Sequence, residues 1–261
     1  MEQEILNRLQ KLPGKIGFYY KNLATGEVIM YQEDESFLAA SVIKLYIMAE
    51  AVRQCKEGIL KKDDVISVDK TKCVPSCGAL TYMHDGLEVT IQDLYTLMII
   101  LSDNSATNFL IDILGEEAIN DCIHMLGHEK TQLNRKMYDA EKSAKGIQNY
   151  VCPSELGAFL EGLYNGEIFD ADCSNHMLSV MKDQRLNGKI PFHIHTIPGH
   201  GPIAHKTGED TGITHDVGIV YAKQPFILVF LGNKTDVARF EREMADISLM
   251  LYEANDIDFL S

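Results

Sequence analysis

The sequence predicts a mixed α/β fold of the α+β type, with one antiparallel sheet drawn from both termini, flanked by helices, and an all-helical lobe inserted between. Two observations support this class. Segments rich in aromatic and β-branched residues lie near the two ends of the chain, and they predict strands. The middle of the chain instead carries apolar residues at helical spacing. A sheet covered by helices is the simplest arrangement that buries both patterns.

The N-terminal part predicts a helix, a hairpin and a second helix. Residues 5–12 place apolar side chains at helical spacing, and a Pro-Gly pair ends that helix. Residues 15–21 and 27–32 have the aromatic and β-branched content of strands, with a short turn between them. The second helix opens at Ser41 and ends near Gly58, because glycine suits the C-terminal end of a helix.

The middle of the chain predicts helices joined by loops. A polar stretch over residues 63–85 contains Pro and Gly and is expected to be loop with short elements. Thr90 is followed three residues later by Asp93, and this capping pair opens a helix that runs to Leu101. Further helices are expected at residues 106–114, 116–125, 153–164 and 171–182, with mostly loop over 129–152.

The C-terminal third returns to strand patterns and closes with a helix. Strands are expected at residues 203–207, 213–222 and 226–232, followed by a long amphipathic helix at 235–253. We therefore expect an α/β lobe of residues 1–40 plus 190–261 and a helical lobe of residues 41–189, within one domain. A ligand site is expected in the cleft between the two lobes.

Composition and charge argue against several classes of function. The 261 residues carry a formal net charge of −14, so neither nucleic acid nor an anionic membrane is an expected partner. No apolar run is long enough for a spanning helix, and the acidic N-terminus is unlike a secretory signal. We expect a cytoplasmic protein as the sequence stands, or a periplasmic or secreted one if a leader was trimmed. We also expect a monomer with no cofactor. No metal is expected, since the closest cysteine pair, Cys73 and Cys77, has no second pair at metal-site spacing.

The first motif whose residue types suggest catalysis is Ser41-Val-Ile-Lys44. On a helix, residues three apart lie on the same face, which brings the Lys44 amine beside the Ser41 hydroxyl. A serine is a weak nucleophile until an adjacent neutral base activates it. The N-terminal end of the helix also favours a developing oxyanion. Taken alone, the same residues fit an N-capping serine with a surface lysine.

Two further motifs follow in order along the chain. Ser102-Asp103-Asn104 lies between two expected helices, where the serine can relay a proton and the asparagine amide can hold a substrate amide. Lys206-Thr207-Gly208 lies on an expected strand, where the lysine offers a charge to a carboxylate and Gly208 leaves room along the strand edge. Each motif alone is weak, and Ser102-Asp103-Asn104 taken alone fits a helix break with two cap residues better than a catalytic role.

Together, the three motifs resemble those of the class A β-lactamases and penicillin-binding proteins, which are penicillin-recognising serine hydrolases. They occur in the expected order, at a helix start, an inter-helix loop and a strand. The surrounding residues resemble the same family over 39–44, 86–108 and 203–220. The resemblance covers roughly residues 15–255, which is nearly the whole chain.

The resemblance implies a role for each motif residue. Ser41 is implied to be the acylated nucleophile, Lys44 the amine that helps deprotonate it, and Ser102 the group that passes a proton to the leaving nitrogen. The substrate-binding residues it implies are Asn104 for the acylamide, Lys206 and Thr207 for the carboxylate, and Gly208 beside them. The oxyanion hole is implied to be the backbone N–H groups of Ser41 and Glu209.

One departure from the family pattern concerns deacylation. Class A enzymes carry Arg-x-Glu-x-x-Leu-Asn, in which the glutamate activates the hydrolytic water. Aligned on Arg135, the glutamate position is Met137 and the asparagine position is Glu141. A methionine cannot act as a base, so the usual deacylation glutamate is missing. Asp139 or Glu141 is the alternative base, unless both are solvated loop charges.

A second departure is His215, which stands nine residues after the motif lysine. Some class A enzymes have an arginine there that contacts the substrate carboxylate. A histidine in that place makes the contact depend on pH. The alternative is a strand histidine packed beside Asp216.

The leading hypothesis is a serine hydrolase of the class A β-lactamase type, which forms an acyl-enzyme at Ser41 and hydrolyses the β-lactam amide. One alternative is a D,D-peptidase or esterase on the same scaffold that deacylates β-lactams slowly. A second alternative is a non-enzymatic penicillin-binding sensor domain. The expected partner is a small β-lactam or D-alanyl-type molecule in each case.

Overall fold

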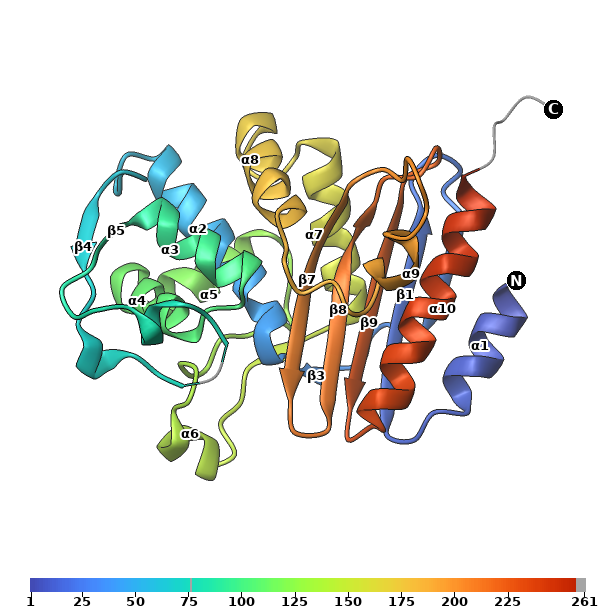
Figure 1. Ribbon diagram of the computed structural model, residues 1–261, viewed down its shortest axis with the longest axis horizontal. Helices are drawn as coiled ribbons and strands as arrows, with labels where there is room; N and C mark the ends of the chain where they lie inside the picture. Colours follow the sequence, from blue (N-terminus) through green and yellow to red (C-terminus); the bar gives the residue numbers. More distant parts are fainter. Residues whose placement is uncertain (76, 257–261) are drawn as a thin grey trace.

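A five-stranded antiparallel sheet forms the middle layer of the molecule (Figure 1). The computed structural model describes residues 1–75 and 77–256. In spatial order the strands are β2 (Val28–Tyr31), β1 (Lys15–Asn22), β9 (Phe226–Asn233), β8 (Ile213–Val220) and β7 (Ile203–Asp210). The expectation of one antiparallel sheet built from both termini is confirmed, because β1 pairs with β9 along its whole length.

The central strand β9 is largely apolar, and both faces of the sheet around it are covered. Every residue of β8 and of β9 is buried. This explains why residues 226–232 form an almost continuous apolar run rather than an alternating one. Exposed side chains lie on the two edge strands, such as Glu209 and Asp210 on β7 and Met30 on β2.

The two terminal helices cover one face of the sheet, as expected. They are α1 (Glu2–Gln10) and α10 (Val237–Asn255), and the short helix α9 (Pro191–Ile194) lies beside them (Figure 1). Their apolar side chains share a core with Phe18 and Phe230, whose ring centroids are 5.0 Å apart.

The other face of the sheet is covered by α7 (Pro153–Asn165) and α8 (Ala171–Lys182), which join it to the helical part of the chain. The helical part consists of α2 (Lys44–Lys56), α3 (Ile91–Ile100), α4 (Asn104–Leu114) and α5 (Glu116–Met125). The expected lobe boundaries place α7 and α8 with the helices, but these two pack against the sheet, and one continuous core runs from the sheet through α2. Residues 76 and 257–261 of the expected lobes lie outside the described residues.

The start of α2 differs from the sequence expectation. Ser41 lies in a 3₁₀ turn, η1 (Ala40–Ile43), and the α-helix itself begins at Lys44.

The capping pair before α3 is confirmed, because Thr90 and Asp93 form a reciprocal capping box. No helix in the described part of the chain combines the length and apolar character needed to cross a membrane.

Short elements were expected within residues 63–85 without bounds, and the others were not predicted, because such elements are too short to show a periodicity. They are β3 (Phe37–Leu38) paired with β6 (Tyr150–Val151), β4 (Val65–Ser67) paired with β5 (Glu88–Thr90), the turns η2 (Lys70–Lys72) and η3 (Leu80–Tyr82), and α6 (Ala140–Ala144). The β3–β6 pair matters most for the site, since it ties the segment before Ser41 to the loop that carries Met137.

Candidate active site

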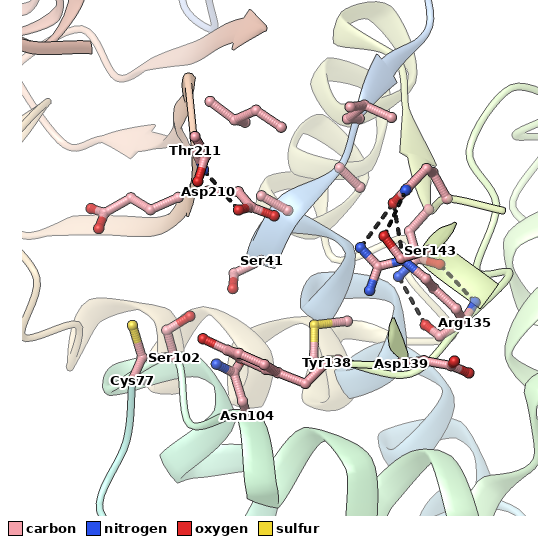
Figure 2. A pocket seen from close by; sticks show the side chains of 18 of the residues that line it. Ser41, Cys77, Ser102, Asn104, Arg135, Tyr138, Asp139, Ser143, Asp210 and Thr211 are labelled. Carbon is pink, nitrogen blue, oxygen red and sulfur yellow. Dashed lines mark hydrogen bonds between the residues drawn. The ribbon is translucent and has the colours of Figure 1, made fainter. Parts of the chain in front are cut away.

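A cavity of about 670 Å³ brings three of the sequence motifs together (Figure 2). Ser41, Ser102, Asn104, Thr207 and Glu209 line it, from η1, the start of α4 and the edge strand β7. The Lys44 and Lys206 amines lie behind this wall, because both side chains are fully buried. The loop before α6 closes the opposite side of the cavity.

Ser41 reaches the cavity through a strained turn. The preceding residue, Ala40, has a φ of +42°, a left-handed conformation that a residue with a Cβ rarely adopts. Ser41 is half-buried, and its hydroxyl makes no hydrogen bond within the described residues. A Cβ on Gly208 would lie 3.3 Å from the Ser41 nitrogen, so this glycine lets the edge of β7 come close to the nucleophile's N–H group.

The Lys44 amine is held inside the protein by three oxygen atoms. Its Nζ lies 2.7 Å from the Ser102 carbonyl oxygen, 3.1 Å from Ser102 Oγ and 2.8 Å from Asn104 Oδ1. Burial and the nearby Lys206 lower the pKa of Lys44 well below its usual value. A neutral amine at this position can accept a proton, which a surface lysine cannot do at neutral pH.

The Ser102 hydroxyl connects the two buried amines. Lys206 Nζ donates to Ser102 Oγ at 3.0 Å, and it donates to the Thr207 carbonyl at 2.7 Å. Burial is the main cause that lowers the pKa of Lys206 to about 7. Ser102 itself has a φ of +54°, so its backbone is held in a left-handed conformation at the centre of this network. The arrangement suits proton relay between the two lysines.

Asp103 anchors the loop that carries Ser102, a role that sequence reasoning missed. Its carboxylate accepts from the N–H groups of Ala106, Ala79 and Leu80 at 2.6 to 2.9 Å. A Cβ on Gly78 would lie 2.2 Å from the Asp103 carboxyl carbon, so only glycine fits there. The signal was present in the sequence, since an aspartate just before a helix is a preferred cap.

The segment around Met137 is fixed by its backbone. Asn108 accepts from the Met137 N–H at 2.8 Å, and its side-chain amide donates to the Met137 carbonyl at 2.9 Å. The Arg135 guanidinium donates twice to the Gln148 side-chain oxygen, at 3.0 and 2.8 Å. The Asn108 bonds hold the loop against α4, and the Arg135 bonds join the two arms of the loop to each other.

The two carboxylates considered as bases are not directed at Ser41. Asp139 accepts from the Lys142 N–H at 2.9 Å and so caps α6, and Figure 2 shows its carboxylate turned away from Ser41. Glu141 lies outside the cavity, where it pairs with Lys145 at 2.6 Å and its side chain is 81% exposed. Glu141 is therefore a solvated charge, which is the alternative that the sequence offered to its role as a base.

The structure contradicts the expected contact of His215 with a substrate carboxylate. The His215 ring is fully buried, with Nε2 2.8 Å from the Leu38 carbonyl and Nδ1 accepting from the Gly232 N–H at 3.1 Å. Burial lowers the pKa of His215 to about 4, so the ring is neutral. It fastens β3 to the sheet. Asp216, the neighbour proposed for it, pairs instead with His205 at 2.8 Å.

Lys189, Cys77 and Tyr138 were not singled out by the sequence analysis. The buried Lys189 amine donates to the Glu209 carboxylate at 2.9 Å and thereby holds the side chain of the residue expected to supply an oxyanion-hole N–H. Cys77 and Tyr138 line the cavity. None of the three residues belongs to one of the sequence motifs, and only the folded chain brings them to the cavity or to Glu209.

Within the described residues, no group of three metal-ligating side chains forms a metal site.

Comparison with known proteins identifies the family. The model of a family described as the beta-lactamase enzyme family matches residues 1–254. The chain belongs to the beta-lactamase enzyme family. Among its relatives, Beta-lactamase ROB-1 from Haemophilus influenzae is 24% identical over 251 residues, which span 94% of this chain and 81% of that protein.

Solved structures agree with this assignment. A beta-lactamase from Sphaerobacter thermophilus has 27% identity and a TM-score of 0.89 over 97% of this chain and 96% of its own. A mutant of PBP-A, solved as an acyl-enzyme complex with penicillin G, has 26% identity and a TM-score of 0.85 over 97% of this chain and 95% of its own. The chain has the class A beta-lactamase fold, and it is a class A beta-lactamase-like serine enzyme, a family that acts on small molecules.

Proposed function

We propose that this protein acylates Ser41 with β-lactam-type amides and releases the product slowly. The observation that carries the proposal is the position of Ser102 Oγ between the buried amines of Lys44 and Lys206, 3.1 and 3.0 Å from them. This network can take a proton from the nucleophile and return it to a leaving nitrogen. Ser41 and Ser102 both line the cavity in which a substrate would bind.

The acylation step needs only residues of this network. The neutral Lys44 amine accepts the Ser41 hydroxyl proton while Oγ bonds to the amide carbonyl carbon. The N–H groups of Ser41 and Glu209 stabilise the oxyanion. When the carbon–nitrogen bond breaks, the proton passes from Lys44 through Ser102 to the leaving nitrogen. The products are an ester at Ser41 and a free amine in the opened ring.

The remaining motif residues orient the substrate. A protonated Lys206, with the Thr207 hydroxyl, would bind the substrate carboxylate. Asn104 Oδ1 accepts from Lys44, which leaves its NH₂ group to bind a substrate amide carbonyl. PBP-A, which shares the fold and 26% of its residues with this chain, was captured in a mutant form as an acyl-enzyme with penicillin G. This supports acylation by a penicillin here.

Deacylation lacks an evident base. Met137 stands where the family resemblance expects the glutamate, and Asn108 fixes its backbone at that place. Asp139 is occupied in capping α6, and Glu141 lies outside the cavity. This observation favours the second candidate, a D,D-peptidase or esterase that penicillin traps, over a fast β-lactamase.

Intact-mass spectrometry after addition of benzylpenicillin tests the proposal. We expect the wild-type protein to gain the mass of the whole antibiotic and to keep it over hours, while Ser41→Ala stays unmodified. Rapid return to free enzyme with hydrolysed penicillin in solution would instead indicate a β-lactamase with another base. Absence of any adduct and of any hydrolysis would refute acylation by β-lactams.

A further inference from the structure

Tyr138 adopts a strained backbone conformation that its own side chain does not stabilise. Its φ is +61°, in the left-handed region that disfavours bulky residues. The side chain is 52% exposed, and its hydroxyl has no hydrogen-bond partner among the described residues. Such strain persists only where the surrounding structure imposes it, and it is concentrated at functional sites.

Both neighbours of Tyr138 impose this conformation. Asn108 holds the Met137 backbone through two hydrogen bonds, at 2.8 and 2.9 Å. Asp139 is fixed on the other side, because its carboxylate caps α6 through the Lys142 N–H. The chain must therefore reverse direction at Tyr138, and the reversal directs the ring into the cavity.

The ring lies beside the residues that would hold the substrate's acyl group. Figure 2 shows Tyr138 extending across the cavity below Ser41, beside Asn104, with its hydroxyl toward Ser102. Tyr138 also lines a second cavity of about 420 Å³, which Phe109 and Val74 help to form.

We propose that Tyr138 is a specificity-determining residue that binds the apolar or aromatic side chain of the substrate's acyl group. The proposal rests on the proposed function, since it takes the amide next to that side chain to bind at Asn104. An exposed aromatic ring with apolar neighbours such as Met137 and Ala140 offers stacking and contact area, but no charge. Substrates with a phenyl or similar group are therefore preferred over those without one.

The test compares two penicillins that differ in what the 6-amino nitrogen carries. Benzylpenicillin carries a phenylacetyl group there, and 6-aminopenicillanic acid carries none, so that its nitrogen is a free amine. The second-order rate constant of acylation at Ser41 is measured for both with wild-type protein, Tyr138→Asn and Tyr138→Phe. Asparagine tolerates the left-handed conformation, so it removes the ring without adding strain. Tyr82→Asn is the matched control, because Tyr82 is 77% exposed and lies outside both cavities.

We expect Tyr138→Asn to slow acylation by benzylpenicillin about tenfold and to change that by 6-aminopenicillanic acid less than twofold. Tyr138→Phe should restore the wild-type preference, and Tyr82→Asn should leave both rates unchanged. An equal loss for both compounds, or no loss for either, overturns the role of Tyr138 and leaves the proposed function standing. Failure of both compounds to acylate wild-type protein overturns the proposed function and this inference with it.

Discussion

The two sides of the cavity are built in opposite ways. On the side of Lys44, Ser102 and Lys206, buried side chains bond to one another, and the two amines have lowered pKa values. On the side of residues 135–149, hydrogen bonds hold the Met137 backbone and pair Arg135 with Gln148, and the Asp139 and Glu141 carboxylates are not directed at Ser41. The first side holds the side chains of Lys44, Ser102 and Lys206 in place, whereas the second holds the backbone of the loop in place. The first side therefore supplies the groups that the proposed acylation needs, and the second supplies no evident base for deacylation.

The largest expected effect is on the reactive side. Lys44→Met keeps the length of the side chain and removes the amine, so the Ser41 proton has no acceptor. General-base catalysis contributes about 10²- to 10⁴-fold, and we expect acylation by benzylpenicillin to slow by about that factor. Stopped-flow or mass-spectrometric acylation rates check this. A loss below tenfold would show that Lys44 is not the base, and a thermal melt confirms that the variant is folded.

The next effect sharpens the contrast between the two sides. Met137→Glu places a carboxylate at the position that Asn108 fixes, and we expect the acyl-enzyme to be hydrolysed about 10²-fold faster. Met137→Gln has the same size without a base and serves as the control. The decay of the penicilloyl adduct gives the rate directly. Equal decay in both variants would mean that this side chain does not reach the ester.

The pH dependence of binding separates the two buried amines. Lys206 has a pKa of about 7, so its charge is present below that pH and is lost above it. Affinity for the carboxylate of benzylpenicillin should therefore fall by up to about tenfold for each pH unit above 7. Burial and the nearby Lys206 lower the pKa of Lys44 as well, but its amine faces Ser102 and Asn104 and is not assigned to the carboxylate. The methyl ester of benzylpenicillin, which lacks the charge, should show no alkaline fall, and an identical fall would contradict the role of Lys206.

The smallest effect concerns the strained loop. Tyr138→Gly removes the steric cost of the left-handed conformation, about 1–2 kcal/mol, and adds a smaller entropic cost. We expect the free energy of unfolding to rise by about 1 kcal/mol, or roughly 2–4 °C in Tm. Differential scanning calorimetry measures it. A lower Tm would show that the ring contributes contacts to the fold that outweigh its strain.

Much of the fold could be predicted because its long elements carry clear patterns. The five strands, the terminal helices on one face and the capping box at Thr90 all follow from local spacing. The lobe boundary did not, because α7 and α8 have the pattern of any buried helix, and nothing in it says that they pack on the sheet. Sheet order and the short β3–β6 pair depend on contacts distant in the sequence.

The candidate site divides in the same way. The three motifs identified Ser41, Lys44, Ser102 and Lys206, because each has a residue type that its implied role requires, and the structure gathers them at one cavity. His215 was misjudged, since its position in the sequence did not reveal that backbone groups occupy both ring nitrogens. Tyr138 was missed, because its orientation comes from bonds made by its neighbours.

The most direct test of the account is the lifetime of the adduct between wild-type protein and benzylpenicillin. Intact mass is followed over time after excess antibiotic has been removed, with Ser41→Ala as the unreactive control. The account predicts a single penicilloyl group on Ser41 that persists for hours while Met137→Glu clears it within minutes. Wild-type protein that returns to its free mass as quickly as Met137→Glu would contradict the claim that this side of the cavity lacks a deacylating base.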